Sequence, residues 1–359
     1  MKILFFYIFM NLGYVLSCDE KCSENSISYL NGEEEHVIGC CFTTNDESLM
    51  NCDFRSLSFD VREINQTQKT KIHPKYFNKE IEFMDITIKC GIISCMNRSS
   101  IENLPINVNE IFPNLKVYML LRGSLKILKY EHFQELKNLI YLNLQENFIE
   151  KIEEETFDDL IALKYLDLSM NKLKNFNPRI FKNNLNLLHL ILFENPLKTF
   201  QPDQFKFLSS LHLLSLCENN FTTFDIKVFE NLVNLKELWL CENQIISIPV
   251  GIFDNLANLE FISLATNQLT TLDENIFAKN SNLRQMELWG NKFTNLSSKI
   301  VENKSNLFRI SFINNTCINT EYGQVDVKEN LTKEEKYQIQ NDIENCCTQK
   351  TVQNYDCGL

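Results

Sequence analysis

Cysteine and histidine are the residues of this 359-residue chain whose chemistry could build a metal or catalytic site. The chain has 13 cysteines and 5 histidines, but no His-Glu-x-x-His pair, no Gly-Lys-Ser/Thr phosphate loop and no Gly-x-Ser-x-Gly elbow. His189 and Cys217 come nearest to a zinc pair. They fall on the third and seventh positions of two neighbouring strands of the repeat pattern, about 13 Å apart along the strand direction, which is too far for one ion. The sequence therefore predicts no enzyme, no cofactor and no metal site.

Glutamates recur in a second pattern that could bind cations. After Glu146, three more follow in consecutive repeats, at Glu194, Glu218 and Glu242. Like charges on strands about 4.8 Å apart repel one another, which could indicate calcium or a cationic partner. However, the surrounding sequence lacks the clustered Asp and carbonyl ligands of a calcium loop. We therefore interpret these glutamates as side chains that splay into water where the chain leaves each strand.

Cys217 and Cys241 lie 24 residues apart and occupy the same position of consecutive repeats. Neighbouring strands would place their Cα atoms about 5 Å apart, which a disulfide accepts, although the facing Cβ atoms would be slightly too far apart for an unstrained bond. The spacing leaves both a bridge and two free thiols open. Because 13 is an odd number of cysteines, at least one cannot pair within the chain, and a disulfide-linked dimer is a further prediction.

A 24-residue period organises the middle of the chain. From Leu115 onward, leucine or a close substitute occupies the first, fourth, sixth, eleventh and fourteenth positions. Asparagine occupies the ninth position except at Gly123, and phenylalanine the nineteenth except at Val301. The asparagines are Asn147, Asn171, Asn195, Asn219, Asn243, Asn267, Asn291 and Asn315. The phenylalanines are Phe133, Phe157, Phe181, Phe205, Phe229, Phe253 and Phe277.

Each repeat predicts a short strand around its fourth to sixth positions, where inward leucines alternate with outward residues. Every unit must bury its leucine face on the next unit, so stacking gives a parallel sheet and one continuous core. The ninth-position asparagine can pair with backbone groups in the turn that follows each strand. Stacked phenylalanines make the opposite layer wider than the strand layer. The predicted solenoid is therefore curved, with the sheet on its concave face and loops and short helical turns on its convex face.

The pattern resembles the 24-residue class of extracellular leucine-rich repeats. It is similar to the repeats of Toll-type receptor ectodomains and of secreted leucine-rich immune proteins of mosquitoes and related insects. This resemblance implies an α/β leucine-rich repeat solenoid that recognises proteins, commonly in innate immunity, adhesion or development. The C-terminal caps of the family usually begin with a Cys-x-Cys pair, whereas this chain has Cys317 and then Cys346-Cys347, with no heptad-patterned coiled coil after them. No membrane span or signalling domain is recognised, so we do not expect a complete receptor.

Four regions are predicted along the chain. Residues 1–17 resemble a secretory signal peptide, with cleavage expected after Ser17. Residues 18–112 contain 7 cysteines and predict an N-terminal Cys-rich cap that ends in a degenerate half repeat. Residues 113–316 hold eight full repeats and a truncated ninth. Residues 317–359 predict a C-terminal Cys-containing helical cap, because a capping box at Thr332 and Glu335 precedes apolar residues at helical spacing.

Cysteine content and glycosylation sequons indicate a secreted glycoprotein. Thirteen cysteines fit an oxidising compartment. The net charge of −12 argues against nucleic acid and anionic membranes as partners. No stretch is long and apolar enough to predict a membrane anchor. The predicted glycosylation sites are Asn65, Asn97, Asn220, Asn295, Asn303, Asn314 and Asn330.

The outward strand positions are where the repeats differ from one another. They are unusually aromatic and apolar, and contiguous patches of this kind usually mark contact sites. The alternative is that these side chains only pack across neighbouring strands. Trp239 and Trp289 are predicted to flank a floor of Ser263 and Ala265 and to be the energetic centre of binding. The predicted protein-binding residues are Tyr141, Asn143, Tyr165, Asp167, His189, Ile191, Phe193, Leu213, Glu237, Trp239, Phe261, Glu287 and Trp289.

We therefore predict a secreted, non-enzymatic protein that binds another extracellular protein through its concave face. One alternative is an extracellular matrix or adhesion component that uses the repeats as a rigid spacer. Another is a glycan-binding module. The variation of aromatic and acidic residues across the sheet favours recognition, because a spacer has no need of it.

Overall fold

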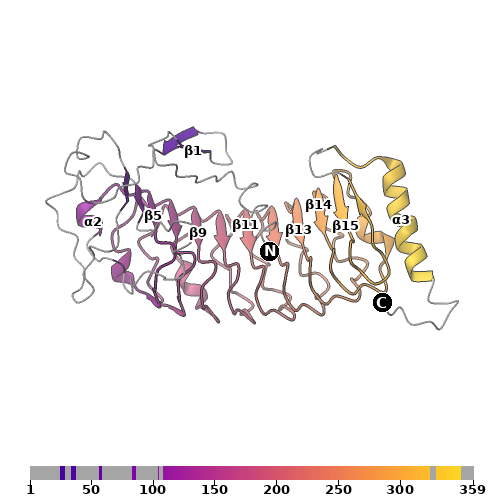
Figure 1. Cartoon of the computed structure of the whole chain (residues 1–359), viewed down its shortest axis with the longest axis horizontal. Coiled ribbons are helices and arrows are strands. Elements are labelled where there is room, and N and C mark those ends of the chain that lie inside the picture. The colour runs from indigo at the N-terminus through magenta and orange to yellow at the C-terminus, as the bar shows by residue number, and fades with distance from the viewer. Residues whose placement is uncertain are drawn as a thin grey trace, which may run out of the picture.

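A computed structural model of the chain describes residues 25–28, 34–37, 56–58, 83–85, 104, 108–323 and 329–348. The strands lie along one side of a stack of coils, and loops with short 3-10 turns form the other side (Figure 1). The nine strands of the repeats have almost identical lengths and a constant spacing. They are β5 (Val117–Met119), β7 (Tyr141–Asn143), β9 (Tyr165–Asp167), β10 (His189–Ile191), β11 (Leu213–Ser215), β12 (Glu237–Trp239), β13 (Phe261–Ser263), β14 (Gln285–Glu287) and β15 (Arg309–Ser311).

These strands pair in parallel, each with the next, and the register never slips. Leu190 of β10 lies beside Leu214 of β11, and Leu214 lies beside Leu238 of β12. A constant register follows from the constant 24-residue period, since a one-residue slip would turn every leucine out of the core. The predicted curved leucine-rich repeat solenoid is confirmed, with its sheet on the concave face.

The parallel sheet begins before the first repeat that the period identifies. β3 (Ser56–Ser58) and β4 (Phe83–Asp85) pair in parallel with each other, and β4 pairs with β5. These two strands lie in the segment that the sequence analysis assigned to an N-terminal cap without repeat register. β1 (Asn25–Ser28) and β2 (Glu34–Val37) form a separate antiparallel pair. The 7 cysteines of this segment lie outside the described residues.

The opposite end of the sheet closes with an antiparallel strand and a helix. β16 (Glu321–Tyr322) pairs antiparallel with β15. The predicted helix is present as α3 (Lys333–Thr348), and its capping box forms, with Thr332 N donating to Glu335 Oε2 at 2.8 Å and Glu335 N donating to Thr332 Oγ1 at 3.1 Å. Ile339 and Ile343 are fully buried, and the helix packs on the 3-10 turn η6 (Ser298–Val301). No helix among the described residues is long and apolar enough to span a membrane.

The remaining elements are short and lie in the N-terminal half of the repeats or on the loop side. They are α2 (Val108–Ile111), β6 (Ile127–Leu128), the 3-10 turn η4 (Tyr130–His132), β8 (Lys151–Ile152), which pairs in parallel with β6, and the 3-10 turn η5 (Pro178–Phe181).

Leucine and phenylalanine layers form one continuous core between the sheet and the loop side. The phenylalanine rings stack from repeat to repeat, with Phe253 and Phe277 centred 5.7 Å apart and inclined by 5°. Rings of Phe229 and Phe253 lie 6.4 Å apart. Burying one such side chain contributes about 2 to 3 kcal/mol, so this layer is a major source of stability.

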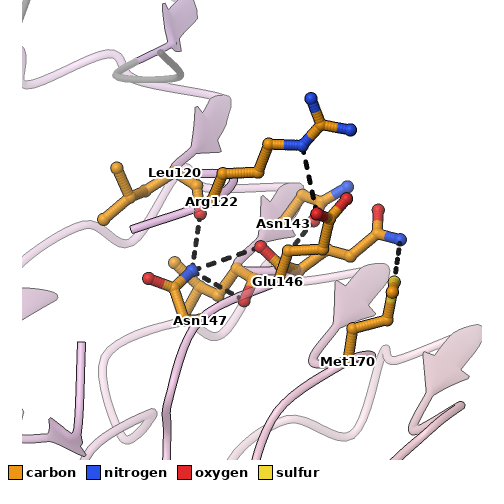
Figure 2. A network of polar contacts seen from close by, with 8 residues as sticks. Leu120, Arg122, Asn143, Glu146, Asn147 and Met170 are labelled. Carbon is orange, nitrogen blue, oxygen red and sulfur yellow. Dashed lines mark hydrogen bonds and ion pairs between the residues drawn. The ribbon is translucent and has the colours of Figure 1, made fainter. Parts of the chain in front are cut away.

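The ninth-position asparagines form hydrogen bonds with backbone groups of the turn that follows each strand. Asn147 Nδ2 donates to the carbonyl oxygens of Leu120, Leu144 and Gln145 at 2.9, 3.0 and 3.3 Å (Figure 2). The same side chain's Oδ1 accepts from the backbone of the preceding repeat. The ladder begins with glycine at Gly123, where a Cβ atom would lie 2.4 Å from Asn147 Oδ1.

Candidate functional site

The outward positions of the strands build a second apolar cluster on the concave face, distinct from the core. Within it, tryptophan, tyrosine, phenylalanine and aliphatic side chains pack against one another across neighbouring strands. The repeat pattern predicts that this face is open to solvent, but most of its side chains are buried; His189, Glu237 and Trp289 are half-buried. All thirteen predicted binding residues lie on this face, at the third, fifth or seventh position of a repeat.

The N-terminal half of this face is polar and aromatic. The rings of Tyr141 and Tyr165 stack at 4.3 Å, and His189 continues the row at 5.9 Å from Tyr165. Asn143 and Asp167 stand beside the tyrosines, and each accepts a hydrogen bond from the backbone N–H two residues later. These bonds fix the side-chain oxygens at the surface of the sheet.

Burial changes the acid–base properties of two groups in this half. Desolvation raises the pKa of Asp167 to about 6, although hydrogen bonds from Ser169 and Tyr165 oppose the shift. Desolvation also lowers the pKa of His189 to about 4, with a smaller contribution from His212. Near neutral pH the face therefore presents a carboxylate at Asp167 and an uncharged imidazole at His189.

The C-terminal half of the face centres on Trp239. Its ring lies 4.2 Å from that of Phe261 on the next strand, and its Nε1 donates to Glu237 Oε2 at 3.2 Å. These two contacts hold the indole across the strands. Ser263 and Ala265, the predicted open floor between the tryptophans, are only 2 % and 0 % exposed. The expected open slot is therefore absent from this arrangement.

Trp289 lies two repeats beyond Trp239, just after β14. Glu287, the last residue of that strand, stands two residues before it, and the side chain of Trp289 helps to lower the pKa of this carboxyl. Glu287 also pairs with Arg309, and Arg309 Nε donates to Glu321 Oε1 at 2.6 Å. Burial raises the pKa of Glu287, and the charge of Arg309 opposes that shift. Each tryptophan thus stands two residues after a glutamate of its own repeat, and Glu237 holds the indole of Trp239 by a hydrogen bond.

Cys217 and Cys241 are joined by a disulfide, so of the two alternatives left open by the sequence the structure has the bridge. Their Cα atoms are 4.5 Å apart, on the seventh positions of neighbouring repeats. The bridge ties the fifth repeat to the sixth on the concave side. It also removes Cys217 as a metal ligand for His189, and no group of three or more metal-ligating side chains occurs in the described part of the chain.

Glutamates line the edge where the chain leaves the strands, at the eighth position of the repeat. Every residue described at this position has a left-handed backbone, including Glu194, Glu218 and Glu242 with φ of 51°, 51° and 52°. Glu146 is paired there with Arg122, whose Nε lies 3.1 Å from Glu146 Oε2 (Figure 2). Glu194 is exposed, whereas the next two are half-buried rather than splayed into water. Burial, followed by the charges of Glu242 and Glu194, raises the pKa of Glu218 to about 7.

A second asparagine ladder runs along the loop side and was not among the predicted features. At the last position of the repeat, Asn234 Nδ2 donates to Ser209 O at 2.9 Å, and Asn258 Nδ2 donates to Val233 O at 2.9 Å. A column of asparagines with the same period was present in the sequence and could have revealed it. The buried Ser215 was also missed as a site residue; its Oγ has no hydrogen-bond partner.

The described sequons are placed unevenly. Asn220 is half-buried, and its Oδ1 accepts from Gln244 Nε2 at 3.3 Å. The four C-terminal sites are exposed: Asn295, Asn303, Asn314 and Asn330. Asn65 and Asn97 lie outside the described residues.

The leucine-rich repeat family model matches residues 113–173, 162–221, 186–245, 209–269 and 233–293, which together span just over half of the 359 residues. This chain belongs to the leucine-rich repeat family. No curated protein matches the sequence.

Solved structures share the fold at low identity. The crystal structure of the TLR13–ssRNA13 complex is 22 % identical with a TM-score of 0.56, over 65 % of this chain and 33 % of that one. The glycosylated Drosophila Toll–Spatzle complex is 21 % identical with a TM-score of 0.55, over 72 % and 36 %. This chain thus spans about a third of the length of these relatives, and the likeness shows a shared solenoid.

Proposed function

We propose that this is a secreted, non-enzymatic recognition protein that binds another extracellular protein through its concave face. The observation that carries the proposal is the second apolar cluster on the outward side of the sheet. A solenoid needs only the inner core to fold. A further layer of Trp239, Phe261, Tyr141 and Tyr165 is therefore best accounted for as a surface for a partner, since aromatic residues are enriched at the energetic centres of interfaces.

A protein is favoured over a nucleic acid as the partner. The similar structures are complexes of TLR13 with single-stranded RNA and of Toll with Spatzle. This chain carries a net charge of −12 and places Asp167, Glu237 and Glu287 on the concave face, which repels phosphate. A glycan is the second candidate partner. The stacked tyrosines and Asn143 offer aromatic rings and an amide, which are suitable groups for binding sugar rings.

The cellular setting belongs to the same proposal. A signal peptide at residues 1–17, Cys-containing caps at both ends of the repeats and N-glycans would place the protein outside the cell, in innate immunity or extracellular signalling. The odd number of cysteines would allow a disulfide-linked dimer. A matrix or adhesion role would instead require concentration-dependent assembly, which analytical ultracentrifugation would detect.

The test is the affinity for proteins captured from extracellular fluid. Trp239→Ala and Trp289→Ala should each weaken binding by about 2 kcal/mol, or about thirty-fold, as measured by calorimetry. Tyr337→Ala is the matched control, because this aromatic side chain is 59 % exposed on α3, away from the sheet. Thermal melts should show all three variants folded. If the tryptophan variants bind as tightly as the control, the concave face is not the binding surface.

A further inference from the structure

Three glutamates form an acidic rail along the edge of the concave face in its middle repeats, the fourth to the sixth. Glu194, Glu218 and Glu242 each stand three residues after the end of consecutive strands, and the backbone N–H of each continues the sheet ladder, donating to the next repeat at 3.0, 3.0 and 2.9 Å. Their φ angles agree within one degree. Identical backbone geometry projects the three side chains in the same direction, one repeat apart.

The fold does not require acids at this position. Arg122, Met170, Thr266, Gly290 and Asn314 occupy it in other repeats with the same sign of φ. A left-handed backbone is unfavourable for glutamate by about 1 kcal/mol relative to glycine. The rail also gathers like charges, since the carboxylates of Glu242 and Glu194 both act on that of Glu218. An acid repeated in three neighbouring repeats, at a position where the fold accepts other residues, indicates a use outside the fold.

The rail borders apolar groups and a polar atom without a partner. Ser215 lies on β11, which runs into Glu218, and the register places it between Ile191 and Trp239 on the concave side. The side chain is 1 % exposed, and its Oγ makes no hydrogen bond. A buried hydroxyl left unpaired costs about 1 to 3 kcal/mol, which a hydrogen-bonding partner group would recover.

We propose that the rail and the apolar side chains beside it, Trp239 and Phe261, bind an extended polypeptide segment that carries lysine or arginine next to apolar side chains. The cations would contact Glu194, Glu218 and Glu242. The apolar side chains would lie against Trp239 and Phe261, and a polar group of the segment would pair with Ser215 Oγ. This inference rests on the proposed function and adds the chemistry of the partner.

The spacing of the rail limits the segment further. Two strand intervals separate the outer glutamates, which is about 10 Å. An extended chain covers that distance in about three residues. Two cations separated by one residue lie about 7 Å apart and would contact two of the three glutamates at once, and the residue between them would point to the opposite side of the segment.

The experiment selects binders to the wild-type protein from a displayed library of random twelve-residue peptides. Enriched peptides should contain paired Lys or Arg within three residues, adjacent to aliphatic or aromatic side chains. Their affinity should fall at least ten-fold in the triple variant Glu194→Gln, Glu218→Gln, Glu242→Gln, and should weaken with added salt. The control triple Glu150→Gln, Glu230→Gln, Glu302→Gln removes the same charge from exposed loop positions and should change affinity less than two-fold.

The outcomes separate this inference from the proposed function. Peptides that lose affinity in Trp239→Ala but not in the rail variant would overturn the cationic segment while leaving the concave face as the binding surface. Peptides whose affinity falls neither in Trp239→Ala nor in the rail variant would overturn both the cationic segment and the concave face as the binding surface. Enrichment of peptides without excess positive charge, or no enrichment on protein shown by melting to be folded, would also overturn the inference.

Discussion

Asn143 and Asp167 occupy the same position of adjacent strands and accept the same backbone hydrogen bond. The parallel register pairs them directly. Asn143 Oδ1 accepts from Gln145 N at 3.0 Å, and Asp167 Oδ1 accepts from Ser169 N at 2.8 Å. Because a neutral amide serves in one repeat, the charge of the carboxylate is not required for this contact in the other.

Asp167→Asn should therefore stabilise the protein near neutral pH. Burial raises the folded-state pKa of Asp167 from 3.8 to about 6, so the folded protein binds this proton more tightly than the unfolded chain. Ionisation then weakens the folded state, and stability falls as the pH rises between these two values. We expect a gain of about 3 kcal/mol at pH 7 that is almost gone at pH 4, measured by urea unfolding.

Asn143→Asp is the matched control for that substitution. It places a carboxylate in the equivalent neighbouring environment and should lower stability at pH 7 but not at pH 4. Equal pH profiles for the wild-type protein and Asp167→Asn would show that the folded carboxyl has an ordinary pKa.

The two asparagine ladders should differ in energetic importance. Asn243 is buried, and its Nδ2 donates to three carbonyl oxygens, those of Leu216, Leu240 and Cys241. Asn243→Ala leaves these groups unpaired and should cost about 3 kcal/mol in unfolding free energy. Asn234 is exposed and makes one such bond, so Asn234→Ala should cost less than about 1 kcal/mol. Similar losses in denaturant melts would refute the distinction.

The fold was predictable because every repeat carries the same structural requirement. Leu214 faces the core for the same reason as Leu238. The constant period leaves only one register in which neighbouring strands can pair. The strands β3 and β4 were missed because their spacing departs from 24 residues, although their backbones continue the ladder. Periodicity detects side-chain repetition, whereas a sheet requires only matching backbones.

The candidate site was predictable only as a set of positions. Alternation placed Trp239 and Trp289 on the concave face, but ring orientation depends on local partners that the spacing does not encode. Trp239 leans onto Phe261 and bonds Glu237, which no 24-residue column reveals. The left-handed backbone at Glu218 was likewise hidden, because glutamate rarely adopts it outside a context that imposes it.

The Cys217–Cys241 bridge should contribute substantially to stability. It closes a loop with a sequence separation of 24 residues, for which the chain-entropy model gives about 3 kcal/mol. The seventh position holds Ser169 and Ala265 in other repeats, so replacing both cysteines by alanine should preserve the fold. We expect the double variant to unfold at lower denaturant concentration, with the difference from wild type closing in reductant. Alkylation of both thiols in unfolded, unreduced wild-type protein would show that the bridge is absent.

Glycans should cluster at the C-terminal end of the solenoid. A glycan needs an exposed acceptor, and Asn295, Asn303, Asn314 and Asn330 are all exposed. Asn220 is half-buried and hydrogen-bonded to Gln244, so its occupancy should be lower. Site-specific glycopeptide mapping of protein secreted from eukaryotic cells checks this. Glycans restricted to Asn65 and Asn97 would contradict the expected distribution.

A glycan moved onto the rail should block binding. Asn314 stands at the eighth position of the last repeat with φ of 57°, and its sequon runs through Asn315 to the following threonine. Glu242→Asn together with Gln244→Thr builds the same sequon on the same backbone in the sixth repeat, around the unchanged Asn243. The equivalence of the two positions makes glycosylation without misfolding the expected result.

The bulk of this glycan would cover the concave edge next to Trp239, so binding of the captured partner should be lost when the glycan is present. Enzymatic removal of the glycan should restore much of the affinity, and the remaining loss should match Glu242→Gln. Protein glycosylated only at its native sites serves as the control, and its affinity should be unchanged by the same enzyme. Full binding by the variant with a confirmed glycan at the new site would show that the partner does not bind to this half of the face.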